Sequence, residues 1–153
     1  MANRRVVITG LGALACNGNS VDEYWTALKE GRHGIAPTTL VDVENHKTKF
    51  SGEVKLENIE IAQRFARNDE EFQGAKRVTT RKDRFVLLAI AAAEEAMKNS
   101  GHDYKNWADP FKVGCIIGAG IGGLKTIETE HQKHMERGPG RISPLLVPKM
   151  IVD

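Results

Sequence analysis

Cysteines are few in this sequence, and a long apolar run is missing. The 153 residues include two cysteines, Cys16 and Cys115, which cannot make the disulfide framework of a small secreted domain. The apolar stretch Val6–Ala15 is broken by polar and glycine residues and is shorter than the ~18 residues of a membrane-spanning helix. Its end, Ala13–Cys16, has a weak signal-like pattern, but a buried strand entering a glycine turn explains it better. We therefore expect a reduced, cytoplasmic setting.

An excess of one charge is also missing, and aromatic residues are scarce. The 22 Lys and Arg residues against 20 Asp and Glu residues give a net charge of +2, and aromatics make up 6%. A nucleic-acid binder that works by bulk positive charge is therefore excluded, so any basic footprint must be local. The 41% apolar and 27% charged residues are typical of a globular chain, and the length fits about one domain.

Three segments have the composition of β-strands. The β-branched run Arg5–Thr9 ends at a glycine turn, and Val113–Ile117 is dense enough in apolar residues to be a central strand. A weaker edge strand is expected over Thr48–Val54. Apolar strands followed by glycine turns and helices predict an α/β chain with a largely parallel sheet and packed helices.

The first predicted helix has clear end signals. Ser20–Glu23 fits a capping box, in which two side chains satisfy free backbone amides at a helix start. The helix is expected over Val21–Glu30, with Trp25 and Leu28 facing inward and Gly31 ending it.

Further helices are expected along the rest of the chain. A polar helix is predicted over Leu56–Arg67, and a second capping box, Thr80–Asp83, is predicted to start an alanine-rich helix that reaches Asn99. Another helix is predicted over Leu124–Glu136, and the proline-punctuated tail leads to a further helix start at Lys149. The alanine-rich helix is thin and should pack closely against a sheet or another helix.

The glycines at Gly118–Gly123 spell GxGxxG after a predicted strand and before a predicted helix. This context suits dinucleotide binding, because helix amides could hold a pyrophosphate. The fingerprint also needs an acidic residue about 20 positions on, at the end of the next strand, and none is found there. The weaker match Gly10–Ala15 lacks it as well. Glycine turns also serve close packing, so a Rossmann-like dinucleotide-binding domain is the alternative interpretation.

Metal and nucleophile motifs are weak. Glu128 and His131 have the ExxH spacing, but a di-iron site needs two such motifs and a zinc protease needs HExxH. Cys16 and Cys115 have no CxxC partner and stand in apolar sequence, where thiols are usually inert core residues. We expect no metal, no cofactor and no catalytic residue among these positions.

Basic residues cluster before the alanine-rich helix, at Lys76, Arg77, Arg81, Lys82 and Arg84. Cations at a helix N-terminus oppose the helix dipole and gain nothing there. The cluster therefore favours an acidic partner. Aromatic residues do not alternate with these cations, which argues against single-stranded nucleic acid.

Six motifs in order then point to one family. They are Arg4–Gly12 (RRVVITGLG), Trp25 with Leu28, Gly31–Ile35 (GRHGI), Asp83–Phe85 (DRF), Gly118–Gly123 (GAGIGG) and Ile142–Pro148 (ISPLLVP). Together they resemble the β-ketoacyl-acyl-carrier-protein synthases, most closely the elongating type II condensing enzymes of fatty-acid and polyketide synthesis. The segment between about residues 54 and 80 is expanded relative to that pattern.

The resemblance implies a thiolase-like fold, of which residues 1–153 are the N-terminal segment, cut before the nucleophile. It implies an acyltransferase that joins an acyl thioester to malonyl-carrier protein by decarboxylating Claisen condensation. The catalytic cysteine and two histidines of the family lie beyond this segment, so the chain alone is expected to be inactive. A carrier-binding remnant without catalysis is a third interpretation.

The resemblance also implies roles for residues of this chain. Gly120, Ile121 and Gly122 match positions that line the acyl tunnel. Leu146 and Val147 match positions that reach across a homodimer into the partner's tunnel. Carrier-protein docking is expected at Arg77, Arg81 and Lys82.

Overall fold

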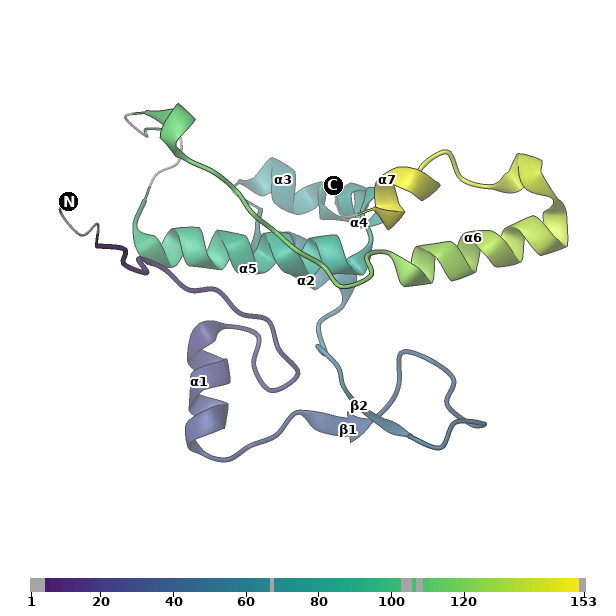
Figure 1. The fold of residues 1–153 in the computed structure, drawn as a ribbon, viewed down its shortest axis with the longest axis horizontal. Coiled ribbons are helices and arrows are strands. Elements are labelled where there is room, and N and C mark those ends of the chain that lie inside the picture. Colours follow the sequence, from purple (N-terminus) through teal and green to yellow (C-terminus); the bar gives the residue numbers. More distant parts are fainter. Residues whose placement is uncertain (1–4, 67, 103–105, 107–108, 152–153) are drawn as a thin grey trace. The chain divides into compact units, whose positions relative to one another are not determined.

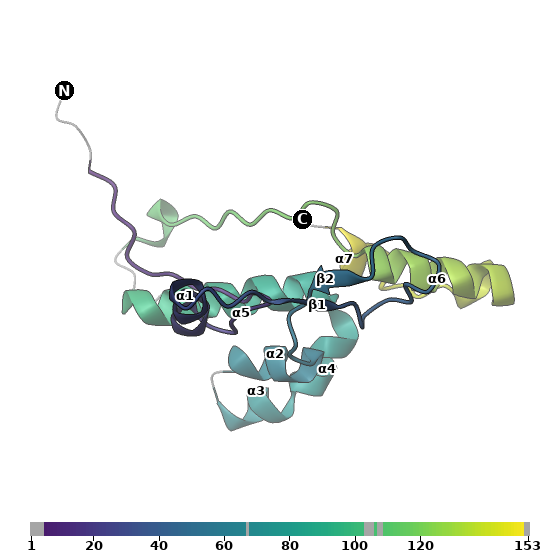
Figure 2. The same cartoon turned by 90° about the horizontal axis from the view of Figure 1, so that it is seen from below.

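The computed structural model describes residues 5–66, 68–102, 106 and 109–151 (Figures 1 and 2). Arg4 of the first motif and the last two residues of the tail lie outside these ranges. The chain divides into two compact units. Unit 1 comprises residues 1–56 and 91–107, and unit 2 comprises residues 57–90 and 108–153.

Helix α1 of unit 1, Val21–Lys29, forms as its end signals predict. The Ser20 hydroxyl accepts the Glu23 amide at 3.2 Å, and the Glu23 carboxylate accepts the Asn19 amide at 2.8 Å. The helix ends at Lys29 with Glu30 as its C-cap, and Gly31 follows with a φ of 69°, in the left-handed region that favours glycine.

The prediction that Trp25 and Leu28 face inward is wrong. Trp25 is 58% exposed and Leu28 46% exposed, whereas Ala27 is fully buried. The small residue is the one that lets α1 approach its neighbours closely, and no described part of unit 1 covers the two large side chains.

Unit 1 holds the sheet of the described chain, an antiparallel pair of short strands. β1, Ile35–Pro37, pairs with β2, Phe50–Gly52, with Ile35 opposite Gly52. The edge strand expected over residues 48–54 is therefore confirmed. Its partner β1 was not expected, because three residues that include a proline carry little strand signal.

A carboxylate closes the loop beside this pair. Glu53 is 6% exposed, and it accepts the Thr39 amide at 2.9 Å, the Thr39 hydroxyl at 2.7 Å and the Leu40 amide at 3.1 Å. These donors stabilise the charged form, the Thr39 hydroxyl most, and lower the pKa of Glu53 from 4.5 to about 2.

The two segments expected as parallel strands do not pair within the described residues. Neither residues 5–9 nor residues 113–117 form a strand, as Figure 1 shows. Val6 is 93% exposed and Ile116 is fully exposed. A strand needs a hydrogen-bonded neighbour, and neither segment has one in the described chain. The parallel sheet predicted from them is therefore not formed here.

The first glycine turn instead packs on the second half of α5, Arg84–Ser100. A Cβ at Gly10 would lie 2.1 Å from the Ala96 carbonyl oxygen, and one at Gly12 would lie 1.8 Å from that of Ala92. Glu95 of α5 accepts the Ala13 amide at 2.9 Å. The glycines and the alanine-rich helix thus permit close backbone contact, as the thin helix predicts.

Unit 2 begins with three short helices. α2 spans Asn58–Arg64, α3 spans Asp69–Gln73 and α4 spans Ala75–Arg81. The helix predicted over residues 56–67 corresponds to α2, which buries Ile61 and Ala62. α3 and α4 were not predicted, because polar and basic residues mask their short apolar faces.

The helix expected after residue 80 is confirmed as α5, but its predicted capping box is wrong. Thr80 lies within α4, where its hydroxyl donates to the Lys76 carbonyl at 3.0 Å. α5 begins after Asp83, whose carbonyl accepts the Val86 and Leu87 amides. The chain leaves α5 through Gly101, at φ 70°.

The C-terminal part of unit 2 contains α6, Leu124–Arg137, as predicted, and it ends at Gly138 with φ 80°. Two 3-10 turns flank it along the chain, Pro110–Lys112 and Pro139–Arg141. The last helix, α7, spans Leu146–Met150, and Ile151 after it is extended, so the prediction of a helix that starts at Lys149 is wrong. Its Pro148 is tolerated because the first turn needs no donor to a preceding carbonyl.

Candidate functional site

The glycine loop Gly118–Gly123 leads directly into α6. A Cβ at Gly118 or Gly120 would meet nothing within 4 Å, so neither glycine is required by packing within the described chain. Gly122 has φ 85°, a left-handed conformation that favours glycine. Gly123 is different, since a Cβ there would lie 2.6 Å from the Lys149 carbonyl oxygen.

This close approach joins the loop to α7. The Gly123 amide donates to the Met150 carbonyl at 3.0 Å. The structure thereby brings the expected tunnel residues Gly120–Gly122 near the helix that carries Leu146 and Val147. Ile121 is 70% exposed and Val147 55% exposed, while Leu146 is half-buried.

The basic cluster lies on α4 and just after it. Lys76, Arg77, Arg81 and Lys82 are exposed, and none of these four side chains has an ion pair or hydrogen bond to another described residue. Arg84, the first residue of α5, is half-buried and donates to Asn58 at 2.7 Å. The cluster is therefore an open cationic surface of unit 2.

One electrostatic argument from the sequence is corrected by this placement. Arg81 lies in the last turn of α4 and Lys82 is its C-cap, so both cations are at a helix C-terminus. There they complement the dipole of α4. Lys76 and Arg77 in the first turn of α4, and Arg84 at the start of α5, do oppose a helix dipole, so the argument from the sequence holds for these three cations only.

Asp83 links the two regions and was not singled out from the sequence as a site residue. It follows Lys82 directly, and its carboxylate accepts a 2.5 Å hydrogen bond from the hydroxyl of Thr126 on α6. The same oxygen lies 2.9 Å from where a Cβ on Gly123 would be. The DRF motif was the available signal, but its contact with Thr126 spans 43 residues of sequence.

A second buried carboxylate fixes the loop between α6 and α7. Glu130 is 7% exposed, forms an ion pair with Lys133 at 2.5 Å and accepts the Ser143 amide at 2.7 Å. The Lys133 ammonium, followed by the Ser143 amide, lowers the pKa of Glu130. The loop that leads to Leu146 is thus tied to α6 by one charged side chain.

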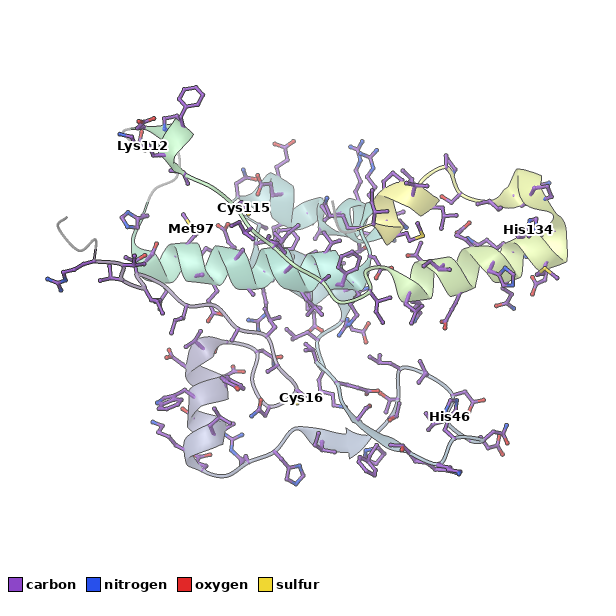
Figure 3. All side chains as sticks on the ribbon, viewed as in Figure 1. Cys16, His46, Met97, Lys112, Cys115 and His134 are labelled. Atoms are coloured by element: carbon purple, nitrogen blue, oxygen red, sulfur yellow. The ribbon has the colours of Figure 1, made fainter. Side chains whose placement is uncertain are left out.

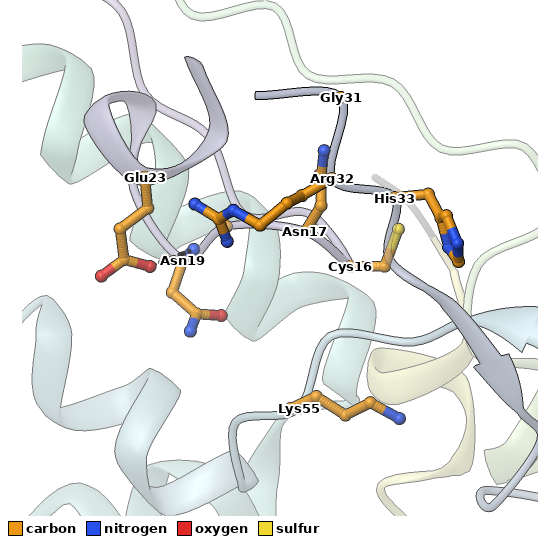
Figure 4. A pocket seen from close by; sticks show the side chains of 9 residues that line it. Cys16, Asn17, Asn19, Glu23, Gly31, Arg32, His33 and Lys55 are labelled. Carbon is orange, nitrogen blue, oxygen red and sulfur yellow. Dashed lines mark hydrogen bonds between the residues drawn. The ribbon is translucent and has the colours of Figure 1, made fainter. Parts of the chain in front are cut away.

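A separate polar pocket of about 530 Å³ lies in unit 1 (Figure 4). Its lining includes Cys16, Asn17, Glu23, His33 and Lys55. Two of the cations that line it are already paired within unit 1, Lys55 with Glu53 at 3.4 Å and Arg32 with Glu30 at 2.6 Å. We assign this pocket no function.

The remaining candidates from the sequence lie apart from one another in the chain. Both cysteines are free thiols; Cys16 is half-buried, but Cys115 is exposed, so the expectation of two core thiols is wrong for Cys115 (Figure 3). Segment 113–117 lacks the paired strands that would have covered it. Glu128 and His131 are exposed on α6, and the described residues contain no group of three or more side chains placed to hold a metal.

Comparison with known proteins identifies relatives along the whole chain. Residues 3–152 match the family model "Beta-ketoacyl synthase, N-terminal domain". The chain is 38% identical to 3-oxoacyl-[acyl-carrier-protein] synthase 2 of Synechocystis sp., covering 100% of this chain and 35% of that protein. It is 42% identical to the enzyme of the same name from Staphylococcus aureus strain COL, covering 99% and 34%. The chain therefore spans about a third of the length of these relatives.

Solved structures share the fold. The ishigamide ketosynthase/chain length factor aligns with a TM-score of 0.74 at 24% identity, covering 98% of this chain and 34% of that chain. A ketosynthase bound to a hexaketide, solved in complex with its type II polyketide synthase acyl-carrier protein, aligns with a TM-score of 0.64 at 22% identity, covering 97% of this chain and 35% of that chain.

Two further observations bear on the class of protein. Among the residues that the structure describes, no helix combines the length and apolar character needed to cross a membrane. The family match covers almost the entire sequence, and the structural matches place the same residues in the α/β, thiolase-like fold of ketosynthases. The chain belongs to the β-ketoacyl synthase family and corresponds to its N-terminal domain.

Proposed function

We propose that this chain is the N-terminal part of a β-ketoacyl-acyl-carrier-protein synthase of fatty-acid or polyketide synthesis. The observation that carries the proposal is the family match over residues 3–152, supported by 38–42% identity to 3-oxoacyl-carrier-protein synthases. The reaction is the decarboxylating condensation of an acyl thioester with malonyl-carrier protein. Both cysteines are free thiols, which fits a cytoplasmic location.

In this proposal the reacting groups lie in the remaining two thirds of the enzyme. A cysteine thiolate there takes the acyl group from its thioester, and the carrier thiol leaves. Two histidines assist loss of carbon dioxide from the malonyl group, and the resulting carbanion attacks the acyl-enzyme carbonyl and releases the cysteine. Covalent catalysis divides one difficult step into two easier ones. Residues 1–153 supply none of these groups and should be inactive alone.

The first contribution of this chain is docking of the acidic carrier protein. Arg77, Arg81 and Lys82 are exposed and have no described partner, so binding a carboxylate would break no existing ion pair. Complementary charges speed association and set orientation. The polyketide ketosynthase that shares the fold was solved with its acyl-carrier protein, which is the kind of partner proposed here.

The second contribution is part of the wall of the acyl tunnel. Gly120, Ile121 and Gly122 form an apolar loop whose exposed Ile121 has no covering side chain in the described unit. Glycines beside it leave room for an alkyl chain. Leu146 and Val147 are proposed to reach the tunnel of a second protomer in a homodimer, which would cover their exposed surface.

Carrier docking is tested by titrating holo-carrier protein into the chain and measuring affinity at increasing salt. Lys82→Ala should weaken binding about three- to tenfold, and the loss should shrink as salt screens the charges. Lys47→Ala is the matched control, because Lys47 is an exposed lysine of unit 1 outside the cluster. Equal affinities for both variants would refute docking at this surface.

The alternative dinucleotide-binding function makes a different prediction. Gly118–Gly123 would then bind NADH, and its fluorescence should change with saturation as the chain is added. The condensing-enzyme proposal predicts no such change. Saturable binding that is lost in Gly120→Val would favour the dinucleotide interpretation over the proposed one.

A further inference from the structure

Asp83 lies where the carrier-docking surface meets the tunnel elements of unit 2. It follows Arg81 and Lys82 of the basic cluster and precedes α5, whose first turn is held by the Asp83 carbonyl. Its side chain is half-buried rather than directed freely into solvent. The backbone of Asp83 therefore lies between the end of α4 and the start of α5, and its side chain is bound to α6.

The carboxylate of Asp83 completes the N-terminal end of α6. The N-cap of α6 is Gly123, which has no side chain to satisfy the free amides or complement the helix dipole. Asp83 brings a negative charge to this end, where it is favourable. Thr126, in the first turn, donates its hydroxyl to Asp83 Oδ2.

The same carboxylate is packed against the junction of the glycine loop and α7. Gly123 is buried, and a Cβ on it would meet both Asp83 Oδ2 at 2.9 Å and the Lys149 carbonyl oxygen at 2.6 Å. The glycine's amide already donates to Met150. A shift of Asp83 would therefore be transmitted to the loop that carries Ile121 and to the helix that carries Val147.

We propose that Asp83 is a positioning residue, and that its hydrogen bond with Thr126 sets the shape of the acyl tunnel relative to the carrier-docking surface. This inference rests on the proposed function and deepens it, because it names a determinant of acyl chain-length selectivity. Gly120 and Gly122 give the loop backbone freedom, so its position must be held from its ends. The Asp83–Thr126 bond holds the end nearest α6.

The test uses the full-length synthase and compares kcat/KM for short and long acyl-carrier substrates. Thr126→Val removes the hydroxyl at nearly constant volume, and Thr129→Val is the matched control one turn along α6, where the hydroxyl only donates to the Lys125 carbonyl. We expect Thr126→Val to change the long-to-short ratio of kcat/KM about three- to tenfold. Thr129→Val should leave this ratio unchanged, and the affinity for carrier protein should be the same in both variants.

Two substitutions at Asp83 make the test independent of stability. Asp83→Asn keeps an oxygen that can accept from Thr126 and should retain most of the native selectivity, whereas Asp83→Ala should lose it. A merely structural role would lower the melting temperature without changing the substrate ratio. If Thr126→Val and Thr129→Val have the same substrate ratio in an active enzyme, the inference is wrong while the proposed function stands. Lack of condensation by the folded wild type would instead refute the proposed function.

Discussion

The close contact between Gly12 and α5 yields a prediction with a worked magnitude. An alanine Cβ at this position would lie 1.8 Å from the Ala92 carbonyl oxygen, and contacts under 3.0 Å are essentially never seen. The neighbouring atom is backbone, so no side chain can rotate away. The segment must therefore move from the helix by roughly 1 Å, which also stretches the 2.9 Å bond from the Ala13 amide to Glu95.

Both losses contribute to the cost of Gly12→Ala. Overpacking of this kind costs about 1–3 kcal/mol, and a hydrogen bond to a charged group contributes about 1.5–3 kcal/mol. The same movement relieves the overpacking and breaks the hydrogen bond, so the two costs do not add in full. We expect the free energy of unfolding to fall by about 2–4 kcal/mol. That is a large part of the free energy of unfolding of a typical domain, about 5–15 kcal/mol.

The assay is hydrogen exchange at the Ala13 amide together with denaturant unfolding. Gly114→Ala is the matched control, because a Cβ at Gly114 meets nothing within 4 Å and its φ is not positive. The control should stay within about 0.5 kcal/mol of the wild type. The close-contact explanation of Gly12 is refuted if the Ala13 amide exchanges as slowly in the Gly12→Ala variant as in the Gly114→Ala variant, and if both variants unfold at the same denaturant concentration.

Three further predictions concern charge and backbone conformation. The pKa of Glu53 is lowered from 4.5 to about 2, so the stability that its charged form contributes to the fold should be complete above pH 4.5 and lost as pH falls toward 2. Hydrogen exchange should show this as a loss of protection of the Thr39 amide. The pH dependence should be absent in Glu53→Gln. The pKa of Glu130 is lowered too, so acid should likewise weaken protection of the Ser143 amide, and Glu130→Ala, which removes the acceptor, should release that amide at neutral pH. Gly31→Ala should cost about 1–2 kcal/mol in thermal unfolding, because its φ of 69° strains a Cβ that meets no neighbour; an unchanged melting temperature would contradict this.

Local signals in the sequence predicted most of the helices. The Ser20–Glu23 pattern and Gly31 located both ends of α1, and Gly138 located the end of α6. These signals act within one or two turns of backbone, so a single sequence contains them. The capping box at Thr80–Asp83 misled because α4 continues through Thr80, and its short apolar face was masked by basic residues.

Pairing and long-range contacts were much harder to predict. Segments 5–9 and 113–117 have strand composition, yet a strand forms only with a neighbour, and none is present in the described residues. Ile121 and Val147 lie on neighbouring elements joined through Gly123, and their place in an acyl tunnel stays a prediction. The Asp83–Thr126 bond was missed because nothing in either local sequence specifies a partner so far along the chain.

The central proposal is that this chain is part of an enzyme that condenses acyl chains delivered by a carrier protein. The most direct measurement supplies the full-length synthase with acyl- and malonyl-carrier protein and analyses the carrier-bound products by mass spectrometry. The account predicts a 3-oxoacyl product two carbons longer than the starting acyl group, formed with release of carbon dioxide and slowed when Arg81 and Lys82 are both replaced by alanine. A folded enzyme that binds both carrier substrates and yields no 3-oxoacyl product would contradict it.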